Sequence, residues 1–369
     1  MKIILFGYGF YVLGDDNLDG GTVMPSLVRW TKISPNNSIQ ITCIVLNPES
    51  KKIAKNRFKS FLKNKSFENK ISYAIKEYNE LKSQERFDCA IIAIPERSHL
   101  SCLKFLIDKT QNMIFVKPFT ENLIQADEAL NLAKNNNKNI FIDFHKRFDE
   151  SNLEFIKNAS RISFDKGLFS FSYGQKSTMP LKYFLKWSKF SNPFQYLAPH
   201  YLHIIFLIIK NQNFDFNNFN IAGNINSFCF KENPHLVSLI SSNLKISDNK
   251  SSYFINSVCN WMEPKMSPFN SRQRIEFQTE GLHLISEQDN RGQLVMSDNS
   301  FKIPNPHFMT DDFNLSSSGY GIASFCNYLE FIEGRFPEKS LTSINDYLPI
   351  AKVIDYVNNN LSISNMNEL

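Results

Sequence analysis

Short apolar runs alternate with longer stretches that carry Lys and Glu through the first 148 residues of the chain. Runs of this length rich in Ile, Val and Phe are typical of buried strands, and the stretches between them are long enough to form helices. The alternation therefore predicts an α/β domain built on a doubly wound parallel sheet. The predicted strands cover residues 2–6, 40–46, 89–94, 113–116 and 140–144, and the predicted helices cover residues 25–32, 49–64, 98–109 and 123–135.

The pattern changes after Arg147-Phe148-Asp149. One long helix is predicted from Asn192, a natural N-cap, through Pro193 at the first helical position to about Lys210. Strand candidates follow and predict a largely antiparallel open sheet, which makes this part an α+β domain. Because 369 residues exceed what one core usually spans, we expect two domains, at residues 1–148 and 149–369. The strand candidates are residues 219–226, 252–260, 272–279 and 282–287, and closing helices are predicted at residues 321–333 and 345–361.

Composition and charge exclude several classes of protein. The formal charge of +5 comes from lysines scattered among acidic residues, without the basic stripe of a nucleic-acid groove. The longest apolar helix candidate, residues 201–209, is too short to span a bilayer, and the chain starts directly with a strand rather than a signal sequence. The six cysteines stand apart, as expected of free thiols in a reducing compartment. We therefore expect a cytoplasmic protein that binds neither nucleic acid nor membranes.

The first strand runs into a glycine turn, Gly7-Tyr8-Gly9. Two glycines here let the backbone bend sharply and approach a pyrophosphate, so Gly7, Gly9 and the following Phe10 are candidate cofactor contacts. The third small residue of such a turn is replaced by Val12, and residues 14–21 look like an inserted loop. The alternative is an ordinary glycine-rich turn. Dinucleotide binding is favoured because the turn lies at the start of an alternating strand and helix unit.

The end of the second strand bears on the choice of nucleotide. An Asp or Glu normally accepts hydrogen bonds from the adenosine ribose of NAD at this place, but Val45, Leu46 and Asn47 stand here. Asn47 and Ser50, with two lysines after them, suit a ribose phosphate, although a solvated helix start explains the same residues equally well. The sequence therefore leaves NAD and NADP as alternatives.

Two further strand ends carry candidate residues. Ile94 and Pro95 follow the strand at residues 89–94 and are expected to form an apolar edge beside the cofactor, with His99 at the start of the next helix. As a lone histidine, His99 is more often a packing residue than a catalyst. Lys117-Pro118 closes the strand at residues 113–116, which places an ammonium at the carboxyl end of a parallel sheet, where a nucleotide cofactor binds.

The order and spacing of several motifs resemble the glucose-fructose oxidoreductase, inositol dehydrogenase and rhizopine catabolism protein family, Gfo/Idh/MocA, over nearly the whole chain. Val116 replaces the glutamate of that family's usual Glu-Lys-Pro. The motifs are Ile92-Ala93-Ile94-Pro95 with His99, Val116-Lys117-Pro118, Lys146-Arg147-Phe148, Lys186-Trp187, Asn192-Pro193 and Tyr196-Leu197-Ala198-Pro199-His200, followed by the weaker segments 271–275, Gly281, Asp289, Arg291-Gly292 and Gly319-Tyr320.

The resemblance implies an amino-terminal Rossmann domain and NAD(P)-dependent oxidation or reduction of a sugar, a cyclitol or a nucleotide-linked sugar, with surface carbohydrate synthesis as one setting. It implies that His200 is the catalytic base and that Lys117 stabilises the developing alkoxide. It also implies homo-oligomers, dimers or tetramers, that pair through the exposed face of the second-domain sheet. No metal is expected. The implied substrate contacts are Lys117, Arg147, Lys182, Trp187, Asn192, His200 and His203.

Helical spacing gathers the candidate residues of the second domain. Tyr196, His200 and His203 are separated by four and three residues and so share one face of a helix. Many relatives carry Asp where this chain has Tyr196, which we treat as a catalytic candidate because a phenol can act as a hydrogen-bond partner or proton relay. The alternative is that these side chains only pack between helix and sheet. Pro199 removes the hydrogen bond to the carbonyl of Gln195 and either bends the helix or marks a later start.

Two competing functions remain open. Val116, Tyr196 and the irregular glycine turn are also compatible with a regulatory protein that binds a dinucleotide without turnover. A glycosidase that uses bound NAD for transient oxidation is a third possibility.

Overall fold

A computed structural model describes residues 1–14, 21–33, 36–63, 70–267, 271–289, 295–297, 300–302 and 321–363. The chain divides into two compact units, which we describe separately. The first unit comprises Met1–Asp149 and Asn305–Tyr347, and the second comprises Glu150–Pro304 and Leu348–Leu369. Most of the predicted loop at residues 14–21, and the segments Arg291-Gly292 and Gly319-Tyr320, lie outside the described residues.

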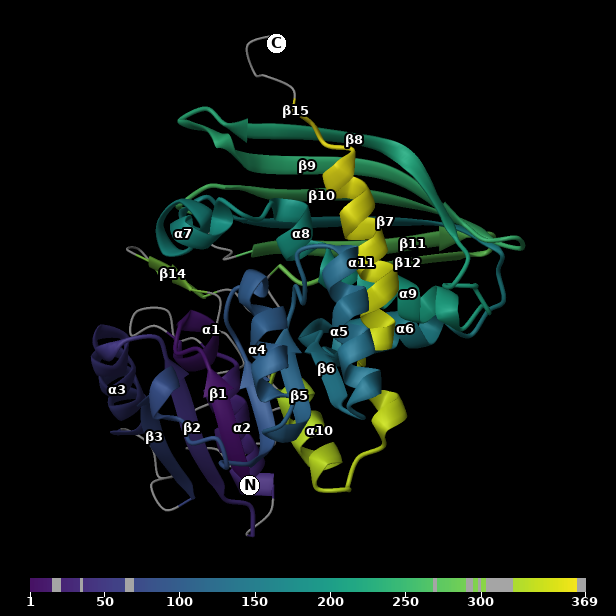
Figure 1. Ribbon diagram of the computed structural model, residues 1–369. Coiled ribbons are helices and arrows are strands. Elements are labelled where there is room, and N and C mark those ends of the chain that lie inside the picture. Colours follow the sequence, from purple (N-terminus) through teal and green to yellow (C-terminus); the bar gives the residue numbers. More distant parts are fainter. Residues whose placement is uncertain are drawn as a thin grey trace. The chain divides into compact units, whose positions relative to one another are not determined.

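The first unit is built on a six-stranded parallel sheet with the order β3-β2-β1-β4-β5-β6 (Figure 1). The order reverses at β1, as in a doubly wound Rossmann sheet, so the predicted fold class is confirmed. Only β3 was not predicted, because its polar residues break the apolar run. The strands are β1 (Lys2–Phe6), β2 (Ile39–Val45), β3 (Ile71–Glu77), β4 (Phe87–Ile92), β5 (Thr110–Val116) and β6 (Asn139–Asp143).

Helices join these strands and cover the sheet. Asn122 caps one of them, since its side chain accepts a hydrogen bond from the backbone of Gln125. The helices are α1 (Phe10–Leu13), α2 (Val23–Ile33), α3 (Pro48–Lys63), α4 (His99–Leu106) and α5 (Leu123–Asn135), with short 3-10 turns η1 (Tyr78–Glu80), η2 (Glu96–Ser98) and η3 (His145–Phe148).

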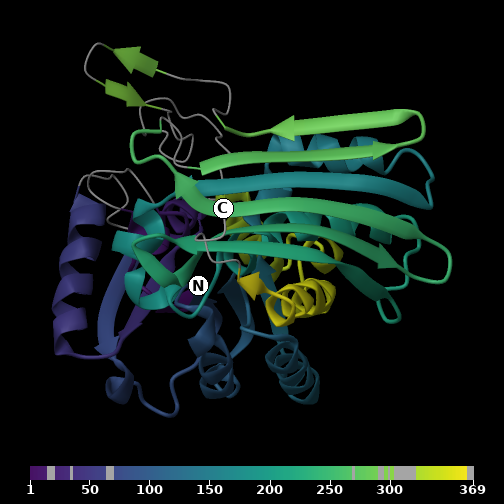
Figure 2. The same cartoon turned by 90° about the horizontal axis from the view of Figure 1, so that it is seen from above.

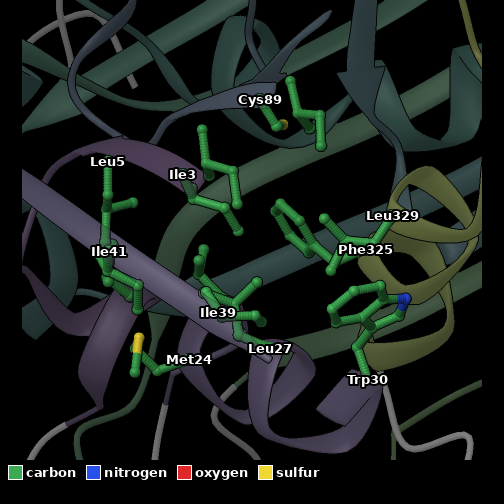
Figure 3. Close-up of a cluster of buried hydrophobic side chains, with 14 of the residues drawn as sticks. Ile3, Leu5, Met24, Leu27, Trp30, Ile39, Ile41, Cys89, Phe325 and Leu329 are labelled. Atoms are coloured by element: carbon green, nitrogen blue, oxygen red, sulfur yellow. The ribbon is translucent and has the colours of Figure 1, made fainter. Parts of the chain in front are cut away.

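Helix α10 (Ile322–Ile332) groups with the first unit, whereas the predicted first domain ends at residue 148. Phe325 and Leu329 on this helix are fully buried and join the core formed by β1, β2 and α2 (Figure 3). Trp30 of α2 packs in the same core and donates a hydrogen bond from Nε1 to Glu330 Oε1 at 2.7 Å. The sequence pattern gives only the apolar face of α10 and not the core that this face joins. A 3-10 turn, η7 (Glu338–Ser340), follows α10.

The second unit is built on a seven-stranded, largely antiparallel sheet with the order β12-β11-β7-β10-β9-β8-β15, as predicted for its class (Figure 2). β7 and β9 were not predicted, and β7 pairs in parallel with β10 at its centre. In β9, Ser238 and Ser242 take buried positions and so interrupt the apolar alternation, whereas β7 was missed although Phe169, Phe171 and Tyr173 alternate with serines. The strands are β7 (Lys166–Lys176), β8 (Asn220–Phe230), β9 (Asn233–Ser247), β10 (Ser252–Glu263), β11 (Ser271–Thr279), β12 (Leu282–Glu287) and β15 (Ser362–Ile363), beside a separate hairpin of β13 (Val295–Ser297) and β14 (Ser300–Lys302).

The two faces of this sheet differ in burial. Along β10, Tyr253, Ile255 and Trp261 are buried, whereas Phe254 and Met262 are 48% and 47% exposed. Alternation of this kind is expected of a sheet with one covered face. Helix α8 packs against β9 and β10 and contributes to that cover. We call the covered side the inward face and the other side the outward face.

The helix predicted from Asn192 to Lys210 is interrupted once. Asn192 is the N-cap, as predicted, and Ala198 keeps helical angles between α8 (Pro193–Leu197) and α9 (Pro199–Lys210). The interruption follows from Pro199, which has no N–H to donate to the carbonyl of Gln195. Other helices of this unit are α6 (Glu150–Ala159), the π-helical turn η4 (Met179–Tyr183) and α7 (Leu185–Ser188), and α11 (Ile344–Asn359) begins in the first unit and continues in the second.

Among the described residues, no helix combines the length and apolar character needed to cross a membrane. The same part of the chain contains no group of three or more His, Cys, Asp or Glu side chains suited to a metal ion. All six cysteines are free, and four of them are buried.

Candidate functional site

The two glycines of the first turn have different structural roles. Gly7 has a φ of +114°, and a Cβ added there would lie 2.3 Å from the carbonyl oxygen of Ala93. Gly9 has a φ of −78°, and no atom lies within 4 Å of its added Cβ. Gly7 is therefore required by the packing of β1 against β4, whereas Gly9 leaves open space above the turn. Phe10 begins α1 with 37% of its surface exposed.

A buried polar network that sequence reasoning missed ties α1 to the sheet. The Tyr11 hydroxyl donates to Asp143 Oδ2 and lies 3.1 Å from His145 Nδ1. Ser324 on α10 donates to Asp143 Oδ1 at 2.5 Å. Asp143 is fully buried. Burial lowers the pKa of His145, and the hydrogen bond and charge of Asp143 oppose this by raising it. The glycine turn is thus followed immediately by a residue that is fixed to β6.

Asp143 also lies beside the Val116-Lys117-Pro118 motif, in which Val116 takes the place of a glutamate. In the parallel register of β5 and β6, Val116 pairs with Asp143. Side chains of paired residues in a parallel sheet point to the same face. The neighbouring strand therefore supplies a carboxylate at the level where Val116 replaces the family's glutamate. Only the strand register, which the sequence does not give, shows this relation.

The end of β2 shows the same arrangement. Val45 pairs with Glu77 of β3, so a carboxylate again stands on the next strand. Lys51 is bound by this region, with its Nζ 2.7 Å from Glu80 and 4.0 Å from Glu77. Asn47 caps α3, because its Oδ1 accepts from the backbone N–H of Ser50 at 2.9 Å. Asn47 and Ser50 thus have a structural role, and Lys51 is paired with acidic groups.

Lys117 directly follows β5, and His99 begins α4 after β4, the strand that lies between β1 and β5. Lys117 is half-buried and is joined to Pro118 by a cis peptide bond. The two ring nitrogens of His99 lie 2.8 Å from the carbonyl oxygens of Ile94 and Phe119. Burial lowers the pKa of His99 to about 4, although both carbonyls act to raise it, so the ring is neutral near pH 7 and donates a hydrogen bond to only one of the two carbonyls, according to its tautomer. His99 therefore joins the loop containing Ile94 and Pro95 to the loop containing Lys117 and Pro118.

Arg147 lies in η3 and is largely buried within the first unit. Its guanidinium donates to Thr342 Oγ1 at 3.3 Å and stands over the Phe148 ring at 5.5 Å. Burial lowers the pKa of this guanidinium.

The second unit buries both histidine candidates. His200 and His203 lie on α9 and are each 1% exposed. Ala198 continues the helical path, so the spacing from Tyr196 to His200 and His203 still places them along one side. Helix α9 has apolar residues on nearly every face, which is typical of a core helix.

Tyr196 belongs to a group of rings that we call the aromatic cluster, made of Phe184, Trp187, Tyr196 and Trp261. The Trp187 ring lies 4.8 Å from that of Tyr196, and Trp261 lies 6.3 Å from both. Sequence reasoning identified Trp187 but missed Trp261, which sits 74 positions further along the chain on β10.

The remaining substrate candidates differ in availability. Lys182 is exposed in η4. Asn192 is buried, its Oδ1 accepts from Gln195 N at 2.9 Å, and its Nδ2 donates to Asn358 Oδ1 at 2.8 Å. Both polar atoms of Asn192 therefore have partners that hold α8 in place.

A hollow of about 330 Å³ lies on the outward face of the second-unit sheet. Polar side chains from β7, β10 and β11 line it, among them Ser170, Asn256 and Arg274. It lies on the opposite side of the sheet from the aromatic cluster, because Asn256 alternates with the inward residues of β10.

Comparisons with known proteins agree with this architecture. Residues 28–144 match the family model GFO_IDH_MocA, an oxidoreductase family with an NAD-binding Rossmann fold. No curated protein sequence matches the chain. Scyllo-inositol dehydrogenase from Lactobacillus casei, solved with NAD(H) and scyllo-inositol, is 12% identical with a TM-score of 0.67 over 98% of this chain and 96% of that chain.

Two other solved structures extend the comparison. Myo-inositol 2-dehydrogenase from Lactobacillus plantarum is 12% identical with a TM-score of 0.68, over 98% of this chain and 96% of that chain. An oxidoreductase from Agrobacterium radiobacter, in complex with NAD+, L-tartaric acid and magnesium, is 14% identical with a TM-score of 0.62 over the same shares of the two chains.

These three structures share the fold, and the family model adds the class of the amino-terminal domain. Residues 28–144, within the first unit, are therefore similar to the NAD-binding Rossmann domain of the GFO_IDH_MocA oxidoreductase family.

Proposed function

We propose that the protein is an NAD-dependent dehydrogenase or reductase that acts on a secondary alcohol or ketone of a neutral sugar or cyclitol. The observation that carries the proposal is that Gly7 and Gly9 follow β1 and Lys117 follows β5, at the carboxyl-end edge of one parallel sheet in which β4 alone separates the two strands. In sheets of this kind, nucleotides bind at this edge where the strand order reverses.

The residues present fit a dinucleotide. Open space above Gly9 admits a pyrophosphate, and Gly7 allows the turn to approach β4. Bound NAD would supply a nicotinamide that accepts or returns a hydride. Glu77 and Glu80 near the end of β2 favour NAD over NADP, because they would repel a ribose phosphate and Lys51 is already paired with them.

The mechanism assigns one role to each unit. Oxidation removes a hydride from the alcohol carbon and a proton from its oxygen. His200 accepts that proton, and Tyr196 is its hydrogen-bond partner or relay. Lys117 donates a hydrogen bond to the developing alkoxide and stabilises its charge. Arg147, Lys182 and Trp187 are proposed substrate contacts, and His203 supports the position of His200.

The substrate class rests on chemistry and on relatives. The aromatic cluster offers apolar ring faces, which suit the C–H faces of a sugar or cyclitol ring. The solved relatives named above include enzymes of scyllo-inositol and myo-inositol. Of a nucleotide-linked sugar of surface carbohydrate synthesis, only the neutral sugar ring would fit this proposal, because the diphosphate is negatively charged. Four buried free thiols suit a reducing cytoplasm.

We also propose a homo-oligomer, a dimer or tetramer, that pairs through the outward face of the second-unit sheet. Large apolar side chains stand exposed on this face, with Phe254, Met262 and Ile285 each close to half exposed. A self-complementary pairing would remove them from water.

The test identifies the nucleotide and then the chemistry. Mass spectrometry of the purified full chain should find NAD, and a panel of cyclitols, sugars and sugar nucleotides should produce NADH absorbance with at least one neutral member. Lys117→Met should abolish that signal but keep nucleotide binding, and Lys104→Met, which changes an exposed lysine paired with Glu128, should have no effect. Nucleotide binding with no redox change across the panel would instead support the regulatory alternative.

A further inference from the structure

Two buried polar atoms on the inward face of the second-unit sheet have no hydrogen-bond partner among the described residues. One is the indole Nε1 of Trp261, a fully buried side chain, and the other is Oε1 of Gln175. Buried donors and acceptors in native proteins are nearly always satisfied, because leaving them unpaired is costly. A partner from outside the chain is therefore expected at each atom.

Strand register places these two side chains next to each other. Asn260 pairs with Gly174 and Glu263 pairs with Lys176, so a bulge sets Trp261 and Met262 opposite Gln175. Met262 is exposed on the outward face, and Trp261 turns inward to the rings of Trp187 and Tyr196. Gln175 lies two residues beyond the buried Tyr173 and shares its face.

The same chain satisfies comparable groups elsewhere. The buried indole of Trp30 donates to Glu330 Oε1 at 2.7 Å. The buried amide of Gln195 accepts from Asn358 Nδ2 at 3.1 Å through its Oε1. Asn256 Oδ1, on the outward face, is also unpaired among the described residues, so what marks Trp261 and Gln175 is that a donor and an acceptor without partners stand on neighbouring strands beneath the aromatic cluster.

We propose that Trp261 and Gln175 form a specificity subsite for a hydroxyl group of the substrate, beneath the rings of Trp187 and Tyr196. A hydroxyl is both donor and acceptor, so it can accept from the indole N–H and donate to the amide carbonyl at once. A carboxylate or phosphate can satisfy only the indole and would bring a negative oxygen towards the carbonyl oxygen of Gln175. The subsite therefore selects a neutral polyol over an acidic sugar.

This inference rests on the proposed function and deepens it, because it names the charge class of the substrate. Removing the Gln175 carbonyl leaves the substrate hydroxyl without an acceptor. Sites built to hydrogen-bond a hydroxyl discriminate strongly between substrates, because a wrong substrate leaves polar groups unpaired. The expected loss of affinity for a neutral polyol is about 10-fold or more.

The first test needs no substrate. Gln175→Met removes the unpaired carbonyl at nearly constant volume, so the ligand-free full chain should keep or raise its melting temperature. Gln195→Met removes an amide that has a partner, so it should lower the melting temperature. Equal destabilisation by the two substitutions would show that Gln175 has a structural partner and would overturn the subsite.

The second test uses matched ligands. Calorimetric titration in the presence of NAD+ compares glucose with glucuronate, and myo-inositol with L-tartrate. We expect the full chain to favour the neutral member of each pair by at least 10-fold, and both Gln175→Met and Trp261→Phe to reduce that preference to within about threefold.

The outcomes separate the two proposals. Binding and oxidation of a neutral polyol that Gln175→Met leaves unchanged would overturn the subsite alone. Preference for the acidic member would do the same. If neither the neutral nor the acidic ligands bind or are turned over, the proposed polyol chemistry fails as well.

Discussion

The strand ends of the first unit and the inward face of the second unit treat buried polar groups in opposite ways. In the first unit, His99 lies between two carbonyl oxygens and donates to one of them, and Asp143 accepts hydroxyl hydrogen bonds from Tyr11 and Ser324. In the second, Trp261 and Gln175 have unpaired polar atoms within the described chain. A site for a constant ligand such as a nucleotide benefits from loops fixed in advance. A site that must distinguish substrates can leave its pairing to the ligand.

The largest expected effect separates the chemical roles of the two units. His200→Asn should lower kcat by about 10² to 10⁴-fold, the usual range for loss of a general base, while nucleotide affinity changes little. Steady-state kinetics with the neutral polyol identified by the panel measure the change. Tyr196→Phe serves as the matched variant and should cost less than His200→Asn. If the kcat of His200→Asn were within threefold of that of the original chain, His200 would not be the catalytic base.

Substitutions of Gly7 and Gly9 test whether the first glycine is needed for folding and the second for nucleotide binding. Gly7→Ala should destabilise folding by about 3 kcal/mol, because the added Cβ meets the Ala93 carbonyl at 2.3 Å and the φ of +114° disfavours a side chain. Gly9→Ala should leave the free energy of unfolding nearly unchanged, since its Cβ enters open space, and should weaken nucleotide binding instead. Chemical denaturation and nucleotide titration of both variants separate the two effects. Equal stability of the two variants would contradict the structural assignment.

His99 should make stability depend on pH. Its pKa falls from 6.5 to about 4 on folding, so the unfolded chain takes up a proton before the folded chain does. Stability is therefore fully present above about pH 6.5 and declines as pH falls to about 4, by about 3 kcal/mol in all. Urea unfolding at several pH values measures this slope, which should be smaller in His99→Asn. Some slope should persist, because burial also lowers the pKa of His145.

The alternation of apolar runs was enough to predict the first unit. Parallel strands buried on both faces read as continuous apolar runs, and five of its six strands were located from them. The strand pairings were not accessible in this way. Val116 with Asp143, and Val45 with Glu77, show that a carboxylate missing from one strand end has a counterpart on the next strand. Only a register shows such a relation.

The second unit was harder to predict for a physical reason. The N-cap at Asn192 is a local signal and was found, but β9 was missed because serines occupy two of its buried positions, Ser238 and Ser242. The alternation of Phe and Tyr with Ser in β7 was present in the sequence and was overlooked. Trp261 was missed because its neighbours Trp187 and Tyr196 come from distant parts of the chain. The proposed meeting of Lys117 and His200 over one carbon stays a prediction.

The network around Asp143 should control nucleotide affinity more than turnover. Asp143→Asn and Tyr11→Phe each remove the bond that fixes α1 after the glycine turn, so each should weaken NAD binding about 5- to 10-fold. Because they break the same bond, the double variant should be hardly worse than either single one. Titration with NAD followed by intrinsic fluorescence gives the three affinities. Additive losses would mean that the two residues act separately.

The smallest expected effect concerns the choice between NAD and NADP. Glu80→Gln frees Lys51, whose Nζ lies 2.7 Å from that carboxylate, and removes one negative charge near the end of β2. Affinity for NADP should rise about fivefold relative to NAD, a modest gain because the pair is exposed to solvent. Glu85→Gln is the matched control, since it removes a carboxylate that pairs with Lys76 at 2.8 Å rather than with Lys51. The gain should shrink as salt is raised, because exposed charges are screened. An unchanged NAD to NADP ratio in Glu80→Gln would show that discrimination resides in the Val45 and Glu77 pair rather than in Lys51.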